Sequence, residues 1–259
     1  MEEPSSDSLY RDKGLCEQLE NYFWPYTASD QVCSSLLLPR WLFCAVRVGI
    51  FGANLASLGL YLRWEEGEKY VYLTFWGLLL TLLCFGLILL NYCYTGLWKF
   101  AHFAFELNWA LTSTTSLLFG IFISDAMTVL DSPWRIFVHA SMLGAITVEL
   151  LNNQLYFFRR HFGLIVLVGL LFIGANVLYS VVAGPVYSEL NPATGDYYLI
   201  LAVGFTFLVL AFVLGGLLDK VKISCVAKRA EDQEFLEEYL EQDASILHNI
   251  FRHRKRPSA

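Results

Sequence analysis

The sequence predicts an all-α membrane protein: a six-helix transmembrane bundle followed by a cytosolic amphipathic C-terminal helix. Three observations predict this fold. The 259 residues are 56% hydrophobic. The apolar residues come in blocks of about twenty, the length that crosses roughly 30 Å of hydrocarbon. The blocks do not alternate as barrel strands do. Because backbone groups in lipid must be satisfied internally, each block is expected to be a helix.

The loops between the six blocks are short, which favours one compact bundle. We divide the chain into an N-terminal segment (1–40), a transmembrane domain (41–218) and a C-terminal segment (219–259). The predicted spans are residues 41–62, 70–92, 101–123, 136–157, 162–183 and 197–218.

The distribution of lysine and arginine predicts the orientation, since acidic residues contribute little to it. Eight basic residues lie near helix ends on the side that holds both termini, against three on the other side, so both termini are expected in the cytosol. No cleavable signal peptide is recognised, and the first span would act as an anchor in the endoplasmic reticulum or plasma membrane. The eight are Arg40, Lys99, Arg159, Arg160, Lys220, Lys222, Lys228 and Arg229; the three are Arg63, Lys69 and Arg135.

The C-terminal segment carries apolar residues at three- and four-residue spacing from about Glu231 to Phe251. This pattern is typical of an amphipathic helix. Its apolar stripe would cover the cytosolic loops, the membrane surface or a protein partner.

Two polar residues at matched depth are the main functional candidates. An ionisable group inside the membrane costs at least a few kcal/mol unless it is partnered, so His139 is a candidate by its position. The second and fourth spans both enter from the non-cytosolic side, which puts Thr74 at a similar depth. A neutral imidazole can accept a hydroxyl proton and activate the oxygen as a nucleophile. The alternative is structural: Thr74 bonded to its own helix and His139 bonded across the bundle.

Further candidates could contact a substrate or its oxyanion. Tyr179, Ser180 and Tyr187 are expected in the same layer as Thr74. Glu149 lies about 15 Å deeper than His139 and is expected to face the interior, neutral or paired.

A second polar set, comprising Arg47, Glu106 and Asn108, is expected towards the cytosolic side. Pairing of Arg47 with Glu106 would neutralise two buried charges. Polar pairs of this kind hold membrane helices together, so a structural role is favoured.

Other chemistries find no support. The six cysteines are scattered without a CxxC spacing, and HExxH, GxSxG and phosphate-binding loop motifs do not occur. No cofactor, metal or nucleic-acid partner is therefore predicted, and the expected partners are membrane lipids.

Three short motifs resemble the androgen-induced and androgen-dependent TFPI-regulating membrane protein family. They are Lys-Tyr-Val-Tyr-Leu-Thr-Phe at 69–75, His139 followed ten residues later by Glu149, and Gly-Pro-Val-Tyr-Ser-Glu-Leu at 184–190. The insect rolling stone proteins share a similar layout. The resemblance covers about residues 70–218 and implies a multi-pass helical fold.

Some members of that family hydrolyse fatty acid esters of hydroxy fatty acids with an intramembrane Thr and His. The resemblance implies that Thr74 is the nucleophile and His139 the catalytic histidine, with Tyr187 in a short Val-Tyr motif. Two departures stand out: the family often has a polar residue just before the histidine, where this chain has Val138, and the acidic C-terminal segment is additional.

Two functions therefore compete. The first is a Thr/His lipid-ester hydrolase. The second is a non-enzymatic, rolling-stone-like scaffold whose polar core is structural and whose C-terminal helix recruits a partner. A transporter comes third, because the few buried charges do not line one continuous path.

Overall fold

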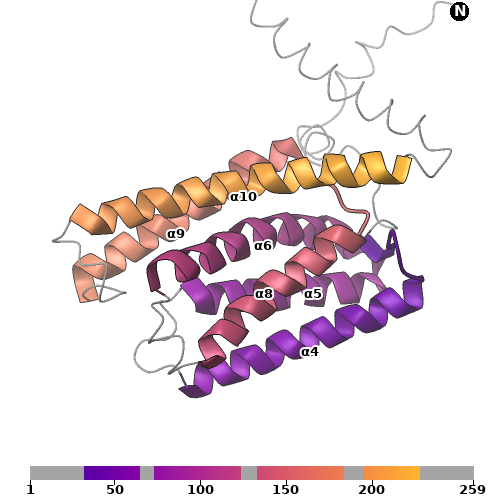
Figure 1. The fold of residues 1–259 in the computed structure, drawn as a ribbon, viewed down its shortest axis with the longest axis horizontal. Coiled ribbons are helices and arrows are strands. Elements are labelled where there is room, and N and C mark those ends of the chain that lie inside the picture. The colour runs from indigo at the N-terminus through magenta and orange to yellow at the C-terminus, as the bar shows by residue number, and fades with distance from the viewer. Residues whose placement is uncertain (1–31, 65–72, 124–132, 184–194, 228–259) are drawn as a thin grey trace, which may run out of the picture. The chain divides into compact units, whose positions relative to one another are not determined.

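A computed structural model describes residues 32–64, 73–123, 133–183 and 195–227 (Figure 1). The chain divides into two compact units, Met1–Gly216 and Leu217–Ala259. The regular secondary structure of the described residues is helical, with one isolated bridge between Ser35 and Asn153. The elements are α4 (Arg40–Trp64), α5 (Leu73–Asn91), η2 (Thr95–Leu97), α6 (Trp98–Leu118), η3 (Phe119–Ile123), α8 (Pro133–Asn152), η4 (Arg159–His161), α9 (Phe162–Ala183) and α10 (Gly195–Ala227).

Five helices are long and apolar enough to cross a membrane: α4, α5, α8, α9 and α10. This makes the chain an integral membrane protein by helix length and composition. Helix α6, the third predicted span, does not belong to these five. It carries Glu106, Asn108 and a run of threonines and serines, and these polar residues are buried inside the protein.

The helices bury polar side chains and expose apolar ones, as expected where the surrounding medium is lipid. In α4 the buried side chains include Arg47, Asn54 and Ser57, whereas Val48 and Leu55 are 54% and 53% exposed. A water-soluble helix shows the opposite arrangement. Polar residues are therefore gathered inside the bundle, among buried apolar ones.

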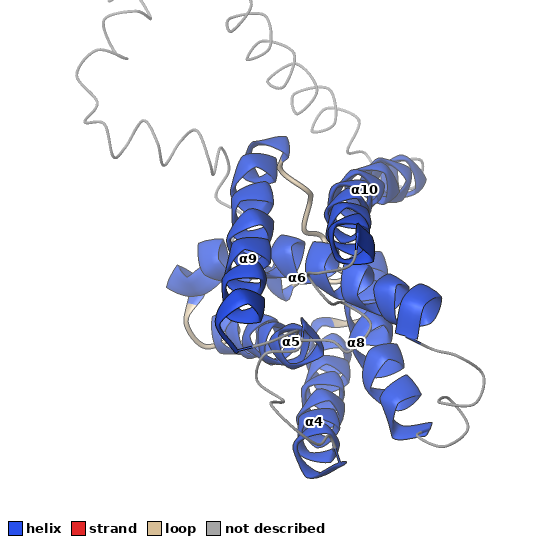
Figure 2. Cartoon of the chain, turned by 90° about the vertical axis from the view of Figure 1, so that its left-hand side faces the viewer, coloured by secondary structure: helices blue, strands red, loops and turns tan. Residues whose placement is uncertain are grey.

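Helix α6 lies at the centre of the first unit (Figure 2). It packs against α5, α8 and α9, and α4 packs on α5 and α8. The indole Nε1 of Trp109 donates a hydrogen bond of 2.7 Å to the Ala211 carbonyl of α10. A Cβ at Gly215 would lie 2.6 Å from the Phe157 ring, so only glycine permits this close approach of α10.

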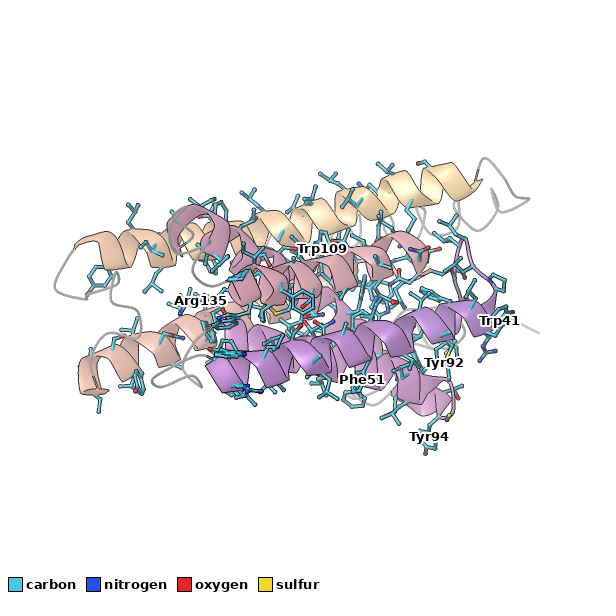
Figure 3. The ribbon with its side chains drawn as sticks, turned by 60° about the horizontal axis from the view of Figure 1, so that its bottom comes forward. Trp41, Phe51, Tyr92, Tyr94, Trp109 and Arg135 are labelled. Carbon is cyan, nitrogen blue, oxygen red and sulfur yellow. The ribbon has the colours of Figure 1, made fainter. Side chains whose placement is uncertain are left out.

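Successive helices run in opposite directions, so that α5 and α8 begin at the same end of the bundle (Figure 1). We call this end the Thr74 end, and the end at which α4 and α6 begin the Arg47 end. Arg135 of α8 and Tyr92, just after α5, lie towards these two ends respectively (Figure 3).

Several predicted spans differ from the observed helices. The third, 101–123, corresponds to α6 from Trp98 to Leu118 and to the π-helical turn Phe119–Ile123. The fourth was expected to continue to residue 157, but α8 ends at Asn152. Residues 153–158 are non-helical and mostly buried. Because they are buried, their backbone groups can bond to protein, whereas lipid offers no hydrogen-bond partners. Helix α10 continues past residue 218 to Ala227. The amphipathic helix predicted for 231–251 lies outside the described residues.

Candidate functional site

The structure brings Thr74 and His139 together at the Thr74 end. Thr74 is the second residue of α5, and His139 lies in the second turn of α8. Thr74 Oγ1 and His139 Nε2 are 3.4 Å apart. The predicted proximity of the two residues is therefore confirmed, at a separation typical of a loose nucleophile–base contact before substrate binds.

Helix α6 and the turn that follows it hold His139 from another side. The Phe119 ring stacks on the imidazole with a centroid distance of 3.9 Å and an interplanar angle of 14°. Ser116 Oγ donates to the His139 carbonyl over 3.4 Å. The second ring nitrogen, Nδ1, is buried and has no hydrogen-bond partner among the described residues. Among the described residues, the imidazole therefore makes one polar contact, which is with Thr74.

An apolar cluster lies beside the pair. Tyr61, Leu78, Val138 and Met142 form a buried core, on which Phe75 and Trp134 pack. Two of these residues, Phe75 and Val138, are the chain neighbours of Thr74 and His139. An apolar setting of this kind strengthens the electrostatic interactions of the polar groups beside it.

Two of the other candidates at this layer, Tyr179 and Ser180, belong to a different helix, α9. Tyr179 is partly buried and Ser180 is buried, both near the end of α9, which packs on α6 and η4. Tyr187 lies outside the described residues.

Glu149 lies at the Arg47 end and forms a buried ion pair. Both carboxylate oxygens accept from Arg47: Nε donates to Oε2 over 2.9 Å, and Nη2 donates to Oε1. Arg47 Nη1 donates to the Tyr92 hydroxyl over 2.9 Å, and Asn153 Nδ2 donates to Glu149 Oε1 over 3.2 Å. The Arg47 guanidinium also stacks on the Phe43 ring at 3.9 Å. Glu149 thus faces the interior and is paired, as predicted.

The predicted pairing of Arg47 with Glu106 is wrong. Glu106 instead binds His161 Nδ1 and accepts the Phe158 N–H over 2.5 Å. His102, one turn earlier on α6, places Nε2 3.5 Å from Glu106 and 2.6 Å from the Tyr156 carbonyl. All three side chains are fully buried.

Glu106, His102 and His161 form what we call the Glu106 network, which joins the non-helical segment 153–158 to α6 by hydrogen bonds. The sequence analysis did not select His102 or His161. The four-residue spacing of His102 and Glu106 on one helix was the available signal. Nothing in the sequence linked His161 to Glu106 across 55 residues.

Among the described residues, no group of three or more His, Cys, Asp or Glu side chains is placed to hold a metal ion. Comparison with protein-family models, curated proteins and solved structures gives no significant match.

Proposed function

We propose that this protein is a six-span intramembrane lipid-ester hydrolase with Thr74 as nucleophile and His139 as general base. One observation carries the proposal: the 3.4 Å approach of Thr74 Oγ1 to His139 Nε2 beside an apolar core. A Thr hydroxyl is a weak nucleophile by itself, and an adjacent imidazole is the standard means of activating it.

The reaction would proceed in two halves. His139 Nε2 takes the Thr74 proton while Oγ1 attacks the ester carbonyl carbon, and the imidazolium then gives that proton to the departing alkoxide. In the second half His139 takes a proton from water, and the resulting hydroxide attacks the acyl carbon. The bond between the acyl carbon and Thr74 Oγ1 then breaks, the imidazolium returns its proton to Oγ1, and the acid leaves. Nε2 must be unprotonated at the start, so the Nδ1–H tautomer is the reactive one.

The substrate class follows from the surroundings and from the family resemblance. A site inside the bilayer suits an ester that partitions into lipid, and the fatty acid esters of hydroxy fatty acids have this property. We propose membership of the androgen-induced family on the motifs at 69–75, at His139 and Glu149, and at 184–190. Both termini would face the cytosol, in the endoplasmic reticulum or plasma membrane.

A non-enzymatic scaffold is the second candidate. The Arg47 and Glu106 networks favour it, because buried ion pairs and hydrogen bonds that join helices need no catalytic explanation. In that case the Thr74–His139 contact would also be structural, and the C-terminal segment would recruit a protein partner.

Activity-based labelling distinguishes the two functions. Purified full-length protein in detergent is treated with a fluorophosphonate probe, and Thr74→Ala is compared with Thr74→Ser. We expect at least about a 100-fold loss of labelling for the alanine variant and retention for serine, which keeps the hydroxyl. Thr147→Ala is the matched control, because Thr147 is half-buried in α8 and bonds only its own helix backbone at Leu143. Labelling of Thr74→Ala at the wild-type rate would reject the hydrolase.

A further inference from the structure

The ring of Phe119 stacks on the His139 imidazole. The two rings are nearly parallel, at 14°, with centroids 3.9 Å apart. Phe119 comes from the end of the central helix α6, whereas His139 comes from α8. A contact between two elements therefore sets the plane of the imidazole.

In a catalytic triad a carboxylate performs this task from the Nδ1 side. It holds the tautomer and ring orientation, and it stabilises the imidazolium that forms during the reaction. Here Nδ1 is buried without a hydrogen-bond partner among the described residues. The carboxylate ten residues further along α8, Glu149, is already bonded to Arg47. Among the described residues, an aromatic face and not a carboxylate is therefore the group that holds the imidazole.

The backbone around Phe119 also positions its ring against His139. Residues Phe119–Ile123 form a π-helical turn directly after α6, and single π-helical turns occur frequently at functional sites. Ser116, three residues before Phe119, donates to the His139 carbonyl over 3.4 Å. The end of α6 therefore holds both the backbone and the ring of His139.

We propose that Phe119 is the positioning residue of the Thr74–His139 pair. The proposal rests on the proposed hydrolase function. The Phe119 ring keeps Nε2 directed at Thr74 Oγ1. When the proton moves from Oγ1 to Nε2 and the Oγ1–C bond forms, the imidazolium lies over the negative face of the ring and gains cation–π stabilisation. The attraction disappears when the proton passes to the leaving alkoxide.

The test compares side chains at position 119 in the full-length protein, with a fluorogenic ester of a long-chain fatty acid as substrate. Phe119→Leu removes the π face and retains an apolar side chain. We expect kcat to fall about 2- to 30-fold, the range of a cation–π contact, with little change in KM. Phe119→Trp and Phe119→Tyr keep the π face and should restore most of kcat. A purely structural role would not distinguish aromatic from aliphatic side chains of adequate size.

Phe105→Leu is the matched control, because Phe105 is fully buried in the same helix and its ring contacts Phe157, not a histidine. It should leave kcat near the wild-type value. If Phe119→Leu does not give monodisperse protein, Phe119→Met supplies the aliphatic arm.

The outcomes separate the two proposals. A wild-type protein that turns over the ester, with Phe119→Leu or Phe119→Met at the same kcat, would overturn the role of Phe119 and leave the hydrolase intact. A well-folded wild-type protein with no turnover and no fluorophosphonate labelling would overturn both. A kcat loss in the aliphatic variants that Trp or Tyr restores supports the proposal.

Discussion

The two ends of the helix bundle differ in how completely their polar side chains are hydrogen-bonded. At the Arg47 end, the Arg47–Glu149 pair is bonded on both oxygens and further engaged by Tyr92 and Asn153. At the Thr74 end, His139 has one polar side-chain contact, at 3.4 Å, and a buried nitrogen without a partner in the described part of the chain.

This difference has a physical meaning. A fully bonded buried charge has no capacity left for a ligand, and breaking such a network is strongly destabilising. A histidine whose side-chain contact is long adds little to stability and keeps its Nε2 available for chemistry. The first arrangement fastens helices, and the second is typical of a reactive group. Substitutions at His139, at the Arg47–Glu149 pair, at Glu106 and at Ser57 test whether the two ends differ in this way.

The largest effect is expected for the histidine itself. His139→Gln should lower the fluorophosphonate labelling rate about 10²- to 10⁴-fold, the usual contribution of a general base. The thermal midpoint should change little, because the side chain makes one long polar contact. His102→Gln is the control: it changes a buried histidine at the Arg47 end and should leave the labelling rate of folded protein unchanged. If His139→Gln were labelled at the wild-type rate, His139 would not be a general base, and the two ends would not differ in their chemistry.

The next largest effect is expected at Glu149. Glu149→Lys places two cations together, and Glu149→Gln leaves the Arg47 charge uncompensated, which costs about 3–5 kcal/mol for a buried pair. Lysine should be tolerated less than glutamine, and replacing both residues by Arg47→Met with Glu149→Leu should recover part of the loss. Thermal unfolding in detergent measures the series. Equal stability of the Gln and Lys variants would contradict the interior pairing.

A smaller effect is expected for Glu106→Gln. Glutamine keeps an oxygen for the Phe158 N–H and loses the charge opposite His161, so the variant should be about 1–3 kcal/mol less stable. Unfolding measurements should show this loss, while labelling of the protein that remains folded stays within about twofold of wild type, since distant sites act independently. A parallel loss of labelling would mean that the two ends are coupled.

The smallest effect is expected for the Ser57–Ser141 bond of 2.8 Å between α4 and α8. Polar contacts between membrane helices contribute about 0.6 kcal/mol on average, so Ser57→Ala should lower stability by about that amount. Thr206→Ala, an exposed residue bonded only to its own helix, serves as the reference. A loss of several kcal/mol would show that this contact belongs with the fastening networks instead.

Depth along the helices could be predicted from the sequence, because the membrane thickness fixes helix length. The fifth predicted span, 162–183, has the same bounds as α9. The same reasoning placed Thr74 and His139 in one layer from two helices that start at the same side, and the structure confirms their contact.

Rotation about each helix axis could not be predicted in this way. Glu106 and Glu149 both lie towards the Arg47 end, and depth alone does not decide which of them faces Arg47. The end of α8 at Asn152 was missed because it depends on side chains far away, since the Phe158 N–H is satisfied by Glu106. Phe119 gave no signal, because one phenylalanine in an apolar span looks like any other.

The central claim is that Thr74 is a nucleophile, and mapping its covalent adduct tests this most directly. Full-length protein in detergent is treated with the fluorophosphonate probe, digested and analysed by tandem mass spectrometry. We predict a single phosphonyl adduct on Thr74 Oγ1, absent in His139→Gln and present in Glu106→Gln. An adduct on another residue, or none on well-folded protein, would contradict the account.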